Sequence, residues 1–215
     1  MSRMLVKRFF CGVAAVICLL PTLLTAQVDD ARFTPSEAYT VDLNFFKLPV
    51  GRTIGSTAGY AIHPAGTSIW VFDRCAANNC VGSDLAPIMQ FDMQGNHLIS
   101  FGANMFVRPH GLHIDGDGNV WVTDGEGPDG EDPRRDGKGH QVFKFSPSGE
   151  ILLTLGKAGI GGDGVDEFNQ PSAVYVAANG DIFVGDGHGR RSNARIMKFD
   201  ATGRFIKTWG SRGIG

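Results

Sequence analysis

The chain repeats one pattern three times, and this repeat constrains its fold more than any other feature. A polar residue, an apolar-aromatic-valine run, one variable residue and an aspartate occur as SIWVFD (68–73), NVWVTD (119–124) and DIFVGD (181–186). A short apolar stretch precedes each run: AGYAIHPAG, HGLHIDGDG and SAVYVAANG. A strand, a glycine turn and a second strand follow each run, at residues 88–102, 142–156 and 196–210. Each unit therefore predicts four short antiparallel strands.

Repeats of four antiparallel strands are typical of β-propeller blades. No helix-period segment follows residue 26, and 30 glycines suit a chain of many turns. We predict an all-β propeller of three to four blades over residues 50–215. Because complete propellers have about 4–8 blades, we expect an incomplete, N-terminal part of a longer propeller. The recurring Asp73, Asp124 and Asp186 predict a structural role, in which each carboxylate accepts hydrogen bonds from turn amides.

The first 26 residues predict a cleaved signal peptide, with a basic start, an apolar run at 9–20 and a small residue, Ala26, at the cleavage point. An uncleaved anchor is the alternative. Residues 27–49 form an N-terminal segment that could supply a closing strand. We expect a secreted or periplasmic protein without a membrane span after cleavage. With 20 basic and 22 acidic residues and no basic stripe, the sequence argues against a nucleic-acid partner.

Two cysteines follow the signal segment, Cys75 and Cys80, in the stretch DRCAANNC. Export to an oxidising compartment favours a local disulfide between them. Two unpaired thiols are the alternative, because sequence does not reveal whether the geometry permits a bond. The loop at 124–140, rich in glycine, proline and mixed charge, predicts a solvated connection between two strands.

Four stretches carry a resemblance to a known family: RPHGLHIDGDGNVWVTD, HQVFKFSPSGEILLTLG, FNQPSAVYVAANGDIFVGDG and ARIMKFDATGRFIKTWG. They resemble NHL-repeat propellers, and most of all the peptidyl-alpha-hydroxyglycine alpha-amidating lyase domain, over residues 50–210. The resemblance implies a secreted, six-bladed, zinc-dependent lyase with a structural calcium. Such a lyase breaks the carbon–nitrogen bond of a C-terminal alpha-hydroxyglycine and releases a peptide amide and glyoxylate.

The resemblance also implies roles for individual residues. His110, in the motif P-H-G-L, matches the first zinc ligand, and Arg74 matches the catalytic arginine. Leu112 and Tyr60 match positions whose backbone carbonyls hold calcium, although the turn before Tyr60 differs in length by one residue. His188 stands where the family has a tyrosine that acts as the base. Imidazole can serve as a base near neutral pH, or the change can mean that the chemistry is lost. The other zinc histidines are expected in blades beyond this chain.

Other interpretations stay open on the residues alone. The protein could be a non-catalytic propeller that binds a protein partner, a peptide or a small-molecule ligand. His110 could be a turn residue bonded to a nearby carbonyl, and Arg74 could form an ion pair between blades. A calcium-based lactonase-like hydrolase is a third possibility, without matching acidic residues on the inner strands. We expect the remaining histidines after the signal segment to lie on the surface or in packing contacts: His63, His97, His113 and His140.

Overall fold

The computed structural model describes residues 40–213. The predicted signal peptide and residues 27–39 lie outside the described residues. The chain divides into two units between Val41 and Asp42, and the second unit contains every strand described below. No helix within residues 40–213 is long and apolar enough to cross a bilayer.

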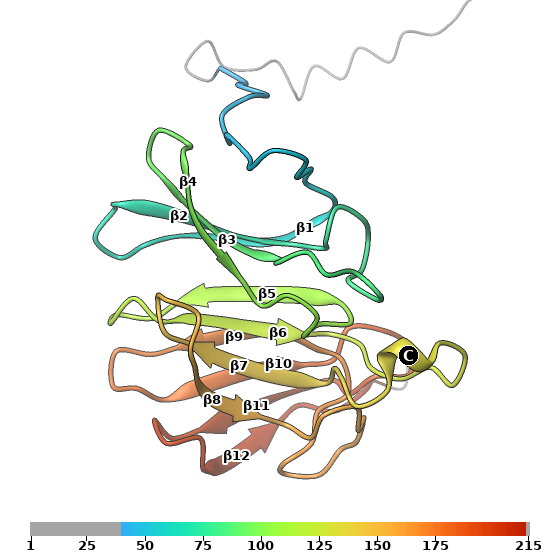
Figure 1. Ribbon diagram of the computed structural model, residues 1–215. Helices are drawn as coiled ribbons and strands as arrows, with labels where there is room; N and C mark the ends of the chain where they lie inside the picture. Colours follow the sequence, from blue (N-terminus) through green and yellow to red (C-terminus); the bar gives the residue numbers. More distant parts are fainter. Residues whose placement is uncertain (1–39, 214–215) are drawn as a thin grey trace, which may run out of the picture. The chain divides into compact units, whose positions relative to one another are not determined.

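The described residues form three antiparallel sheets of four strands each, joined in simple sequence order (Figure 1). Blade one contains β1 (Thr57–Ile62), β2 (Ser68–Asp73), β3 (Ile88–Asp92) and β4 (His97–Phe101). Blade two contains β5 (Pro109–Ile114), β6 (Val120–Asp124), β7 (Gln141–Phe145) and β8 (Ile151–Leu155). Blade three contains β9 (Pro171–Val176), β10 (Ile182–Asp186), β11 (Arg195–Phe199) and β12 (Phe205–Trp209). This arrangement confirms the predicted all-β propeller.

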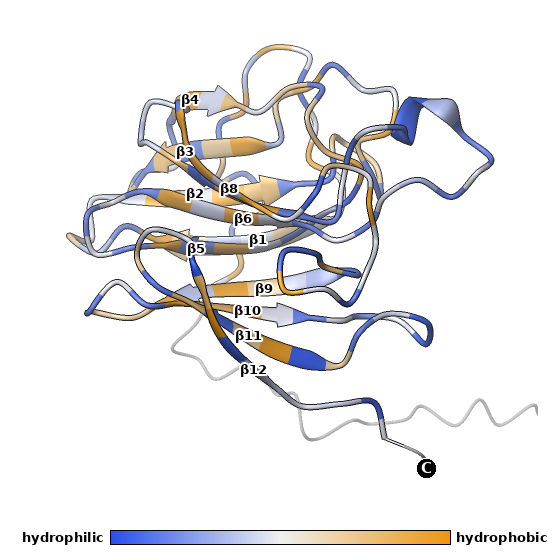
Figure 2. Ribbon diagram, turned by 90° about the horizontal axis from the view of Figure 1, so that it is seen from below, coloured by the Kyte–Doolittle hydropathy of each residue, from blue (hydrophilic) through white to orange (hydrophobic). Residues whose placement is uncertain are grey.

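The inner strands β1, β5 and β9 are neighbours from blade to blade. A 3-10 turn, η2 (Pro133–Arg135), interrupts the loop between β6 and β7 and is strongly hydrophilic (Figure 2). The same view shows hydrophobic residues concentrated in the strands and hydrophilic ones in the loops.

The core consists of side chains that pack between consecutive blades. Trp70 and Phe72 of β2 pack with Val122 of β6, whereas Trp121 of β6 packs with Val184 of blade three. Strand β6 is buried along its whole length because blades cover both of its faces. Each fully buried large apolar side chain contributes roughly 1.5–3 kcal/mol to folding, so the interfaces between blades dominate the stability.

The three repeated aspartates perform the predicted structural role. Asp73 accepts hydrogen bonds from the amides of Gly55 and Ala76 (2.7 and 2.9 Å). Asp124 accepts from the amides of Val107 and Arg108 (2.8 and 2.6 Å). Asp186 likewise accepts from the amide of Asn169 (2.8 Å). Each carboxylate therefore ties the end of a second strand to the segment that leads into the inner strand.

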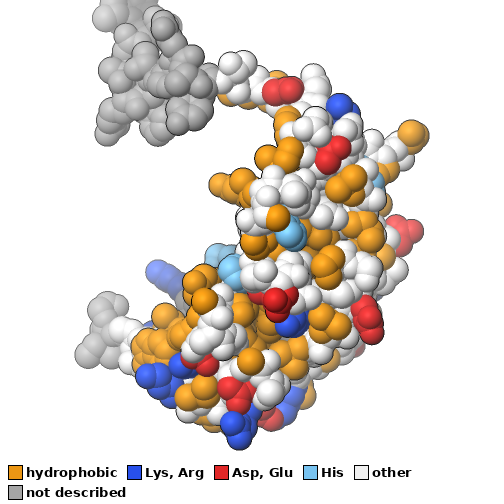
Figure 3. Space-filling model, turned by 90° about the vertical axis from the view of Figure 1, so that its left-hand side faces the viewer, with side chains coloured by type: hydrophobic (Ala, Val, Ile, Leu, Met, Phe, Trp, Pro, Cys, Tyr) orange, Lys and Arg blue, Asp and Glu red, His pale blue; other side chains and the backbone are white. Residues whose placement is uncertain are grey.

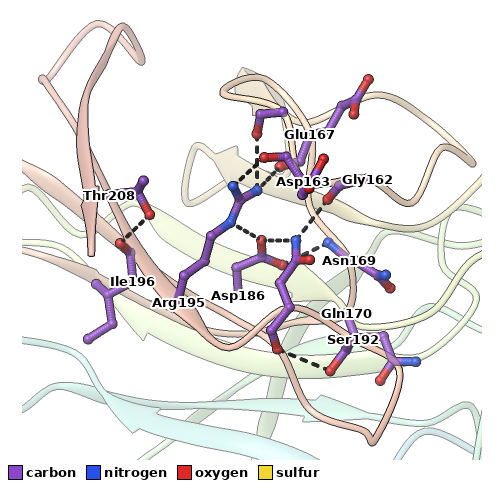
Figure 4. A network of polar contacts seen from close by, with 12 residues as sticks. Gly162, Asp163, Glu167, Asn169, Gln170, Asp186, Ser192, Arg195, Ile196 and Thr208 are labelled. Atoms are coloured by element: carbon purple, nitrogen blue, oxygen red, sulfur yellow. Dashed lines mark hydrogen bonds and ion pairs between the residues drawn. The ribbon is translucent and has the colours of Figure 1, made fainter. Parts of the chain in front are cut away.

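Asp186 and Arg195 belong to a wider network of hydrogen bonds, shown in Figure 4. The Nε of Arg195 donates to the Asp186 carboxylate at 2.9 Å. Its Nη2 donates to the carbonyls of Gly164 and Glu167 at 3.0 and 2.9 Å. One arginine on β11 thus fixes the loop that precedes β9.

Cys75 and Cys80 form a disulfide with a Cα–Cα distance of 5.1 Å, and both residues are buried. The expected local bond is therefore present. The loop that it closes follows β2 directly, so it also fixes the residue after that strand, Arg74. The backbone of the loop is held further by a hydrogen bond from the Cys80 amide to the carbonyl of Val107 (2.9 Å).

Part of the N-terminal segment lies against blade one. Lys47 forms a single parallel bridge with Asn96, and Phe46 and Leu48 pack on a buried cluster of that blade. Beside it, a cavity of about 520 Å³ is lined by apolar side chains that include Tyr60 and Ile62. Figure 3 shows one face of the molecule, on which hydrophobic side chains lie among charged ones.

Candidate functional site

A β-bulge near the start of each inner strand creates the candidate site. In blade two, Pro109 pairs with Asp124 and Leu112 pairs with Val122, so His110 and Gly111 oppose the single residue Thr123. The register of β1 and β9 shifts at the same place. The extra residues are Ala58, His110 and Ser172. A bulge re-aims its extra side chain and occurs often beside active sites.

His110 is held in one tautomer by the neighbouring blade. Its Nδ1 lies 2.9 Å from the carbonyl oxygen of Ser172. A carbonyl only accepts, so Nδ1 must carry the proton and donate it, which leaves the lone pair on Nε2. Burial lowers the pKa of His110, the bond to Ser172 opposes this shift, and the charge of His188 adds to it. The ring is therefore neutral near pH 7, with Nε2 available as an acceptor or ligand.

His188 lies beside His110 although the two residues are far apart in sequence. Their ring centroids are 4.5 Å apart, with an angle of 65° between the rings. His188 follows β10, and its amide donates to the hydroxyl of Ser192 at 2.8 Å. The structure thus brings together two of the residues that the sequence proposes for the site.

Arg74 reaches the same place from blade one. Its Nε donates to the carbonyl of Pro109, the residue before His110, at 2.9 Å. Its Nη1 donates to the side chain of Asn78 at 2.8 Å. No ion pair of Arg74 occurs within residues 40–213, so the contact between blades uses a backbone carbonyl instead. Burial lowers the pKa of Arg74, and the charge of Arg108 adds to the effect, but a guanidinium stays protonated in proteins.

Arg74 is the cation beside the histidines that lacks a carboxylate partner within residues 40–213, whereas the other two arginines nearby are ion-paired. Glu126 pairs with Arg108 and, at 3.2 Å, with Arg135. Arg74 and Arg108 both contribute to lowering the pKa of His110. The guanidinium of Arg74, beside two imidazoles, favours an anionic ligand such as a carboxylate.

His110 has the arrangement that a metal-binding histidine needs. Such a histidine donates its second ring nitrogen to a carbonyl or carboxylate, which fixes its orientation. Among the described residues, however, no three histidine, cysteine or acidic side chains gather as a metal site. His110 therefore fits one zinc ligand position, and the described part of the chain does not supply a complete set.

Tyr60 and Leu112 occupy equivalent positions on neighbouring inner strands. Tyr60 pairs with Val71 and Leu112 pairs with Val122, each two residues before the repeated aspartate. The register therefore shows that the two residues are equivalent within this chain. A Cβ added at Gly59 would lie 3.0 Å from the Cβ of Leu112, so the two strands approach closely there. Calcium binding by these carbonyls stays a prediction.

The other histidines lie away from this group. His113 stacks near Tyr175 of blade three, at 5.1 Å between ring centroids, while Leu112 packs toward blade one. The side chains of these two neighbouring residues therefore point to opposite faces of the strand. His140 is buried and accepts from the amide of Gln170 at 3.3 Å, which places it in a packing contact.

Sequence reasoning missed Ser172, Ser192, Arg108 and Glu126. For Ser172 a signal existed, because it occupies the same column of the repeat as His110 in HGLHIDGDG and SAVYVAANG. Arg108 and Glu126 flank matched motifs but belong to loops, which carry no repeat. Their meeting depends on how the chain folds around the carboxylate of Asp124.

No protein-family model matches the chain. Peptidyl-alpha-hydroxyglycine alpha-amidating lyase 2 of Drosophila melanogaster is 40% identical over 109 residues, which cover 50% of this chain and 23% of that protein. Peptidyl-glycine alpha-amidating monooxygenase A of Xenopus laevis is 44% identical over 180 residues, covering 75% of this chain and 17% of that protein. NHL repeat-containing protein 3 of Mus musculus is 28% identical over 167 residues, which cover 75% of this chain and 43% of that protein. The chain spans less than half the length of each of these relatives.

Solved structures with a similar arrangement include virginiamycin B lyase from Staphylococcus aureus, with 15% identity, a TM-score of 0.47, and coverage of 74% of this chain and 42% of that chain. The WD40 repeats of RRP9 are 12% identical, with a TM-score of 0.48, and the match covers 74% of this chain and 39% of that chain. The propeller assignment itself follows from the three blades described above. In sequence, the chain is similar to the peptidyl-alpha-hydroxyglycine alpha-amidating lyases at about 40% identity over about half of its length.

Proposed function

We propose that this chain carries part of the active site of a lyase that acts on peptides ending in alpha-hydroxyglycine. One observation carries the proposal: Arg74, His110 and His188 come from three different blades and meet at one site. By the resemblance to the alpha-amidating lyases, these residues match three functional positions, at one of which His188 replaces a tyrosine. The sequence similarity to the alpha-amidating lyases points to the same activity.

The charges of the site suit the substrate and the reaction. Arg74 binds the terminal carboxylate of the hydroxyglycine, because guanidinium groups pair with carboxylates in a bidentate manner. His188 accepts the proton of the substrate hydroxyl as a general base. The oxygen then forms the carbonyl of glyoxylate, the carbon–nitrogen bond breaks, and the amide nitrogen takes up a proton. The products are a peptide amide and glyoxylate.

Zinc and calcium belong to the proposal as expected cofactors. His110 would hold zinc through Nε2, while the carbonyls of Leu112 and Tyr60 would contribute to a structural calcium site. A bound zinc ion supplies Lewis-acid stabilisation of a substrate oxygen. The further zinc ligands would have to come from outside the described residues. Secretion or a periplasmic location, directed by the first 26 residues, completes the proposal, and the disulfide suits an oxidising compartment.

The experiment measures glyoxylate release from a short peptide that ends in alpha-hydroxyglycine. It uses zinc chloride and the purified protein in a form that includes the further zinc ligands. We expect His110→Ala and Arg74→Ala each to reduce kcat/KM by at least about 100-fold, as for groups that stabilise charge at an active site. His188→Tyr restores the residue of the family and should retain activity, whereas His188→Ala should lose it. Zinc content, measured by elemental analysis, should fall in His110→Ala.

His63→Ala is the matched control. His63 lies at the turn between β1 and β2, and its side chain accepts a hydrogen bond from the amide of Ala65. Its activity should equal that of the unmodified protein. No glyoxylate release by the unmodified protein, combined with retained peptide binding by calorimetry, would favour the alternative of a non-catalytic propeller that binds a peptide or protein. Equal activity of all variants would contradict the proposed site.

A further inference from the structure

We infer that Ser172 is a positioning residue that holds His110 and His188 together as a pair. It is the bulged residue of blade three, at the place that His110 occupies in blade two. Its carbonyl contacts the ring of His110, and its hydroxyl contacts the carbonyl of Gly187, the residue before His188.

The carbonyl of Ser172 orients His110 directly. It accepts the Nδ1 proton at 2.9 Å, which sets the tautomer and leaves the lone pair on Nε2. Because the acceptor is a main-chain atom, any residue at position 172 can provide it if the bulge is kept. The close approach of β5 and β9 at this point depends on Gly111, where an added Cβ would lie 2.9 Å from the Ser172 carbonyl oxygen.

The hydroxyl of Ser172 fixes the backbone that carries His188. It lies 2.9 Å from the carbonyl oxygen of Gly187 and 3.3 Å from that of Gly185. Both oxygens only accept, so the hydroxyl proton is donated to the nearer Gly187. The residue after Gly187 is His188, whose ring contacts His110.

The turn at 187–189 is held on its other side as well. The buried hydroxyl of Ser192 accepts from the amides of His188 and Gly189, at 2.8 and 2.9 Å. The amide of Gly187 donates to the carbonyl of Gln170 at 3.1 Å. With these bonds in place, removal of the Ser172 hydroxyl frees one side of the turn and leaves the rest of the fold intact.

The fold itself does not require a hydroxyl at this bulge. Blade one forms the same bulge with Ala58, and blade two forms it with His110. The hydroxyl is therefore specific to the blade whose following loop carries His188. This comparison within one chain separates a positioning role from a general structural role.

The expected effect of Ser172 on catalysis rests on the proposed function. The spectroscopic test of the histidine pair does not require turnover. The full chain, labelled with ¹⁵N-histidine, is compared as unmodified protein, Ser172→Ala, Ser172→Thr and Ser68→Ala. Ser68 is a matched control, because it is a strand serine that is even more buried than Ser172, accepts from Gln90 at 2.9 Å, and lies at the opposite end of its strand from Arg74.

We expect Ser172→Ala to retain the Nδ1–H tautomer of His110, read from its ¹⁵N shifts, and to lose at least half of the nuclear Overhauser signal between the rings of His110 and His188. Ser172→Thr keeps the hydroxyl and should restore that signal, and Ser68→Ala should leave it unchanged. Where the protein is active, Ser172→Ala should lower kcat by roughly 10–100-fold with little change in KM, the scale expected for a misplaced catalytic group.

An unchanged ring-to-ring signal in Ser172→Ala, or an equal loss in Ser68→Ala, would overturn the inference. If Ser172→Ala does not fold, Ser172→Cys serves instead, because a thiol is a weaker donor of similar size, and the same loss is expected. Absence of lyase activity in the unmodified protein would count against the proposed function alone, since the ring-to-ring signal is read without substrate.

Discussion

Three aspartates occupy the same position in the three blades, but their charge environments differ. Asp73 pairs with Arg52 at 2.7 Å, and Asp186 pairs with Arg195 at 2.9 Å. Asp124 accepts two amide hydrogen bonds and has no ion pair within residues 40–213. Burial raises the pKa of Asp124 to about 7, although the two amide bonds lower it. Asp124 is therefore the aspartate whose charge is least compensated.

This difference predicts that an aspartate-to-asparagine substitution lowers the free energy of unfolding by unequal amounts at Asp186 and Asp124. Asp186→Asn leaves the Arg195 guanidinium, with 11% of its side chain exposed, without its carboxylate, and removal of one partner of a buried ion pair costs about 3–5 kcal/mol. Asp124→Asn loses one amide hydrogen bond, worth about 1 kcal/mol, and removes an uncompensated buried charge. Urea unfolding at pH 8 measures both free energies. If both variants lose the same free energy of unfolding, the loss is determined by the carboxylate itself and not by its arginine partner.

At the scale of elements, the bulge of β5 requires glycine at position 111. A Cβ on Gly111 would lie 2.9 Å from both the Cα of Ala173 and the carbonyl oxygen of Ser172. Gly111→Ala should therefore push β5 away from β9 and cost roughly 1–3 kcal/mol, as for other overpacked sites. The Nδ1 contact of His110 should lengthen at the same time. Gly116→Ala is the control, because no atom lies within 4 Å of its added Cβ.

Chemical denaturation gives the two free energies, and ¹⁵N-histidine spectra report the tautomer of His110. We expect Gly111→Ala to change both readouts and Gly116→Ala to change the free energy of unfolding by no more than about 0.5 kcal/mol. A stable Gly111→Ala variant with an unchanged His110 tautomer would contradict the close-approach argument.

The disulfide loop between β2 and β3 offers a second test at this scale. Closing a loop of this length contributes about 2 kcal/mol by restricting the unfolded chain. For a protein of this size that corresponds to a decrease of roughly 4–8 °C in Tm when Cys75 and Cys80 are both replaced by alanine. A reductant should lower the Tm of the unmodified protein by a similar amount and leave that of the double variant unchanged. Equal sensitivity of both proteins to reductant would argue against the bond.

Sequence predicted the elements better than the site. The repeat located all three blades. Ala58, His110 and Ser172 stand in one column of the repeat, and the structure shows that each is the bulged residue of its blade. The meeting of His110 with His188 depends on the turn at 187–189, whose path is set by hydrogen bonds from Ser172 and Ser192. Loops carry no periodicity, so a pattern of strands does not determine where their side chains meet.

At the scale of the whole molecule, buried titratable groups set how stability depends on pH. Burial lowers the pKa of His110, His113 and His140. The folded protein therefore keeps these rings neutral where the unfolded chain, with a histidine pKa of about 6.5, takes up protons. Stability from these groups is present above about pH 6.5 and is lost as the pH falls below it.

Asp124 acts in the opposite direction. Its folded pKa of about 7 exceeds the unfolded value of about 3.9, so the folded protein retains a proton that the unfolded chain releases. This contribution to stability is complete below the unfolded pKa and is lost as the pH rises through about 7. Between about pH 4 and 6.5 the aspartate therefore opposes the three histidines, because it releases a proton on unfolding whereas they take up protons.

As the pH falls from 7 to 5, the three histidines lower the stability and Asp124 raises it. Two variants should therefore change the loss of stability with falling pH in opposite directions. Asp124→Asn removes the opposing contribution and should steepen the loss. His140→Gln removes a histidine with 8% exposure and should make the loss shallower. Urea unfolding at half-unit steps from pH 5 to 8 measures how the free energy of unfolding depends on pH in the unmodified protein and in both variants. His63→Gln, at a strand turn, is the control. A steeper slope in both variants would contradict the assignment, because the two groups exchange protons with opposite sign on unfolding.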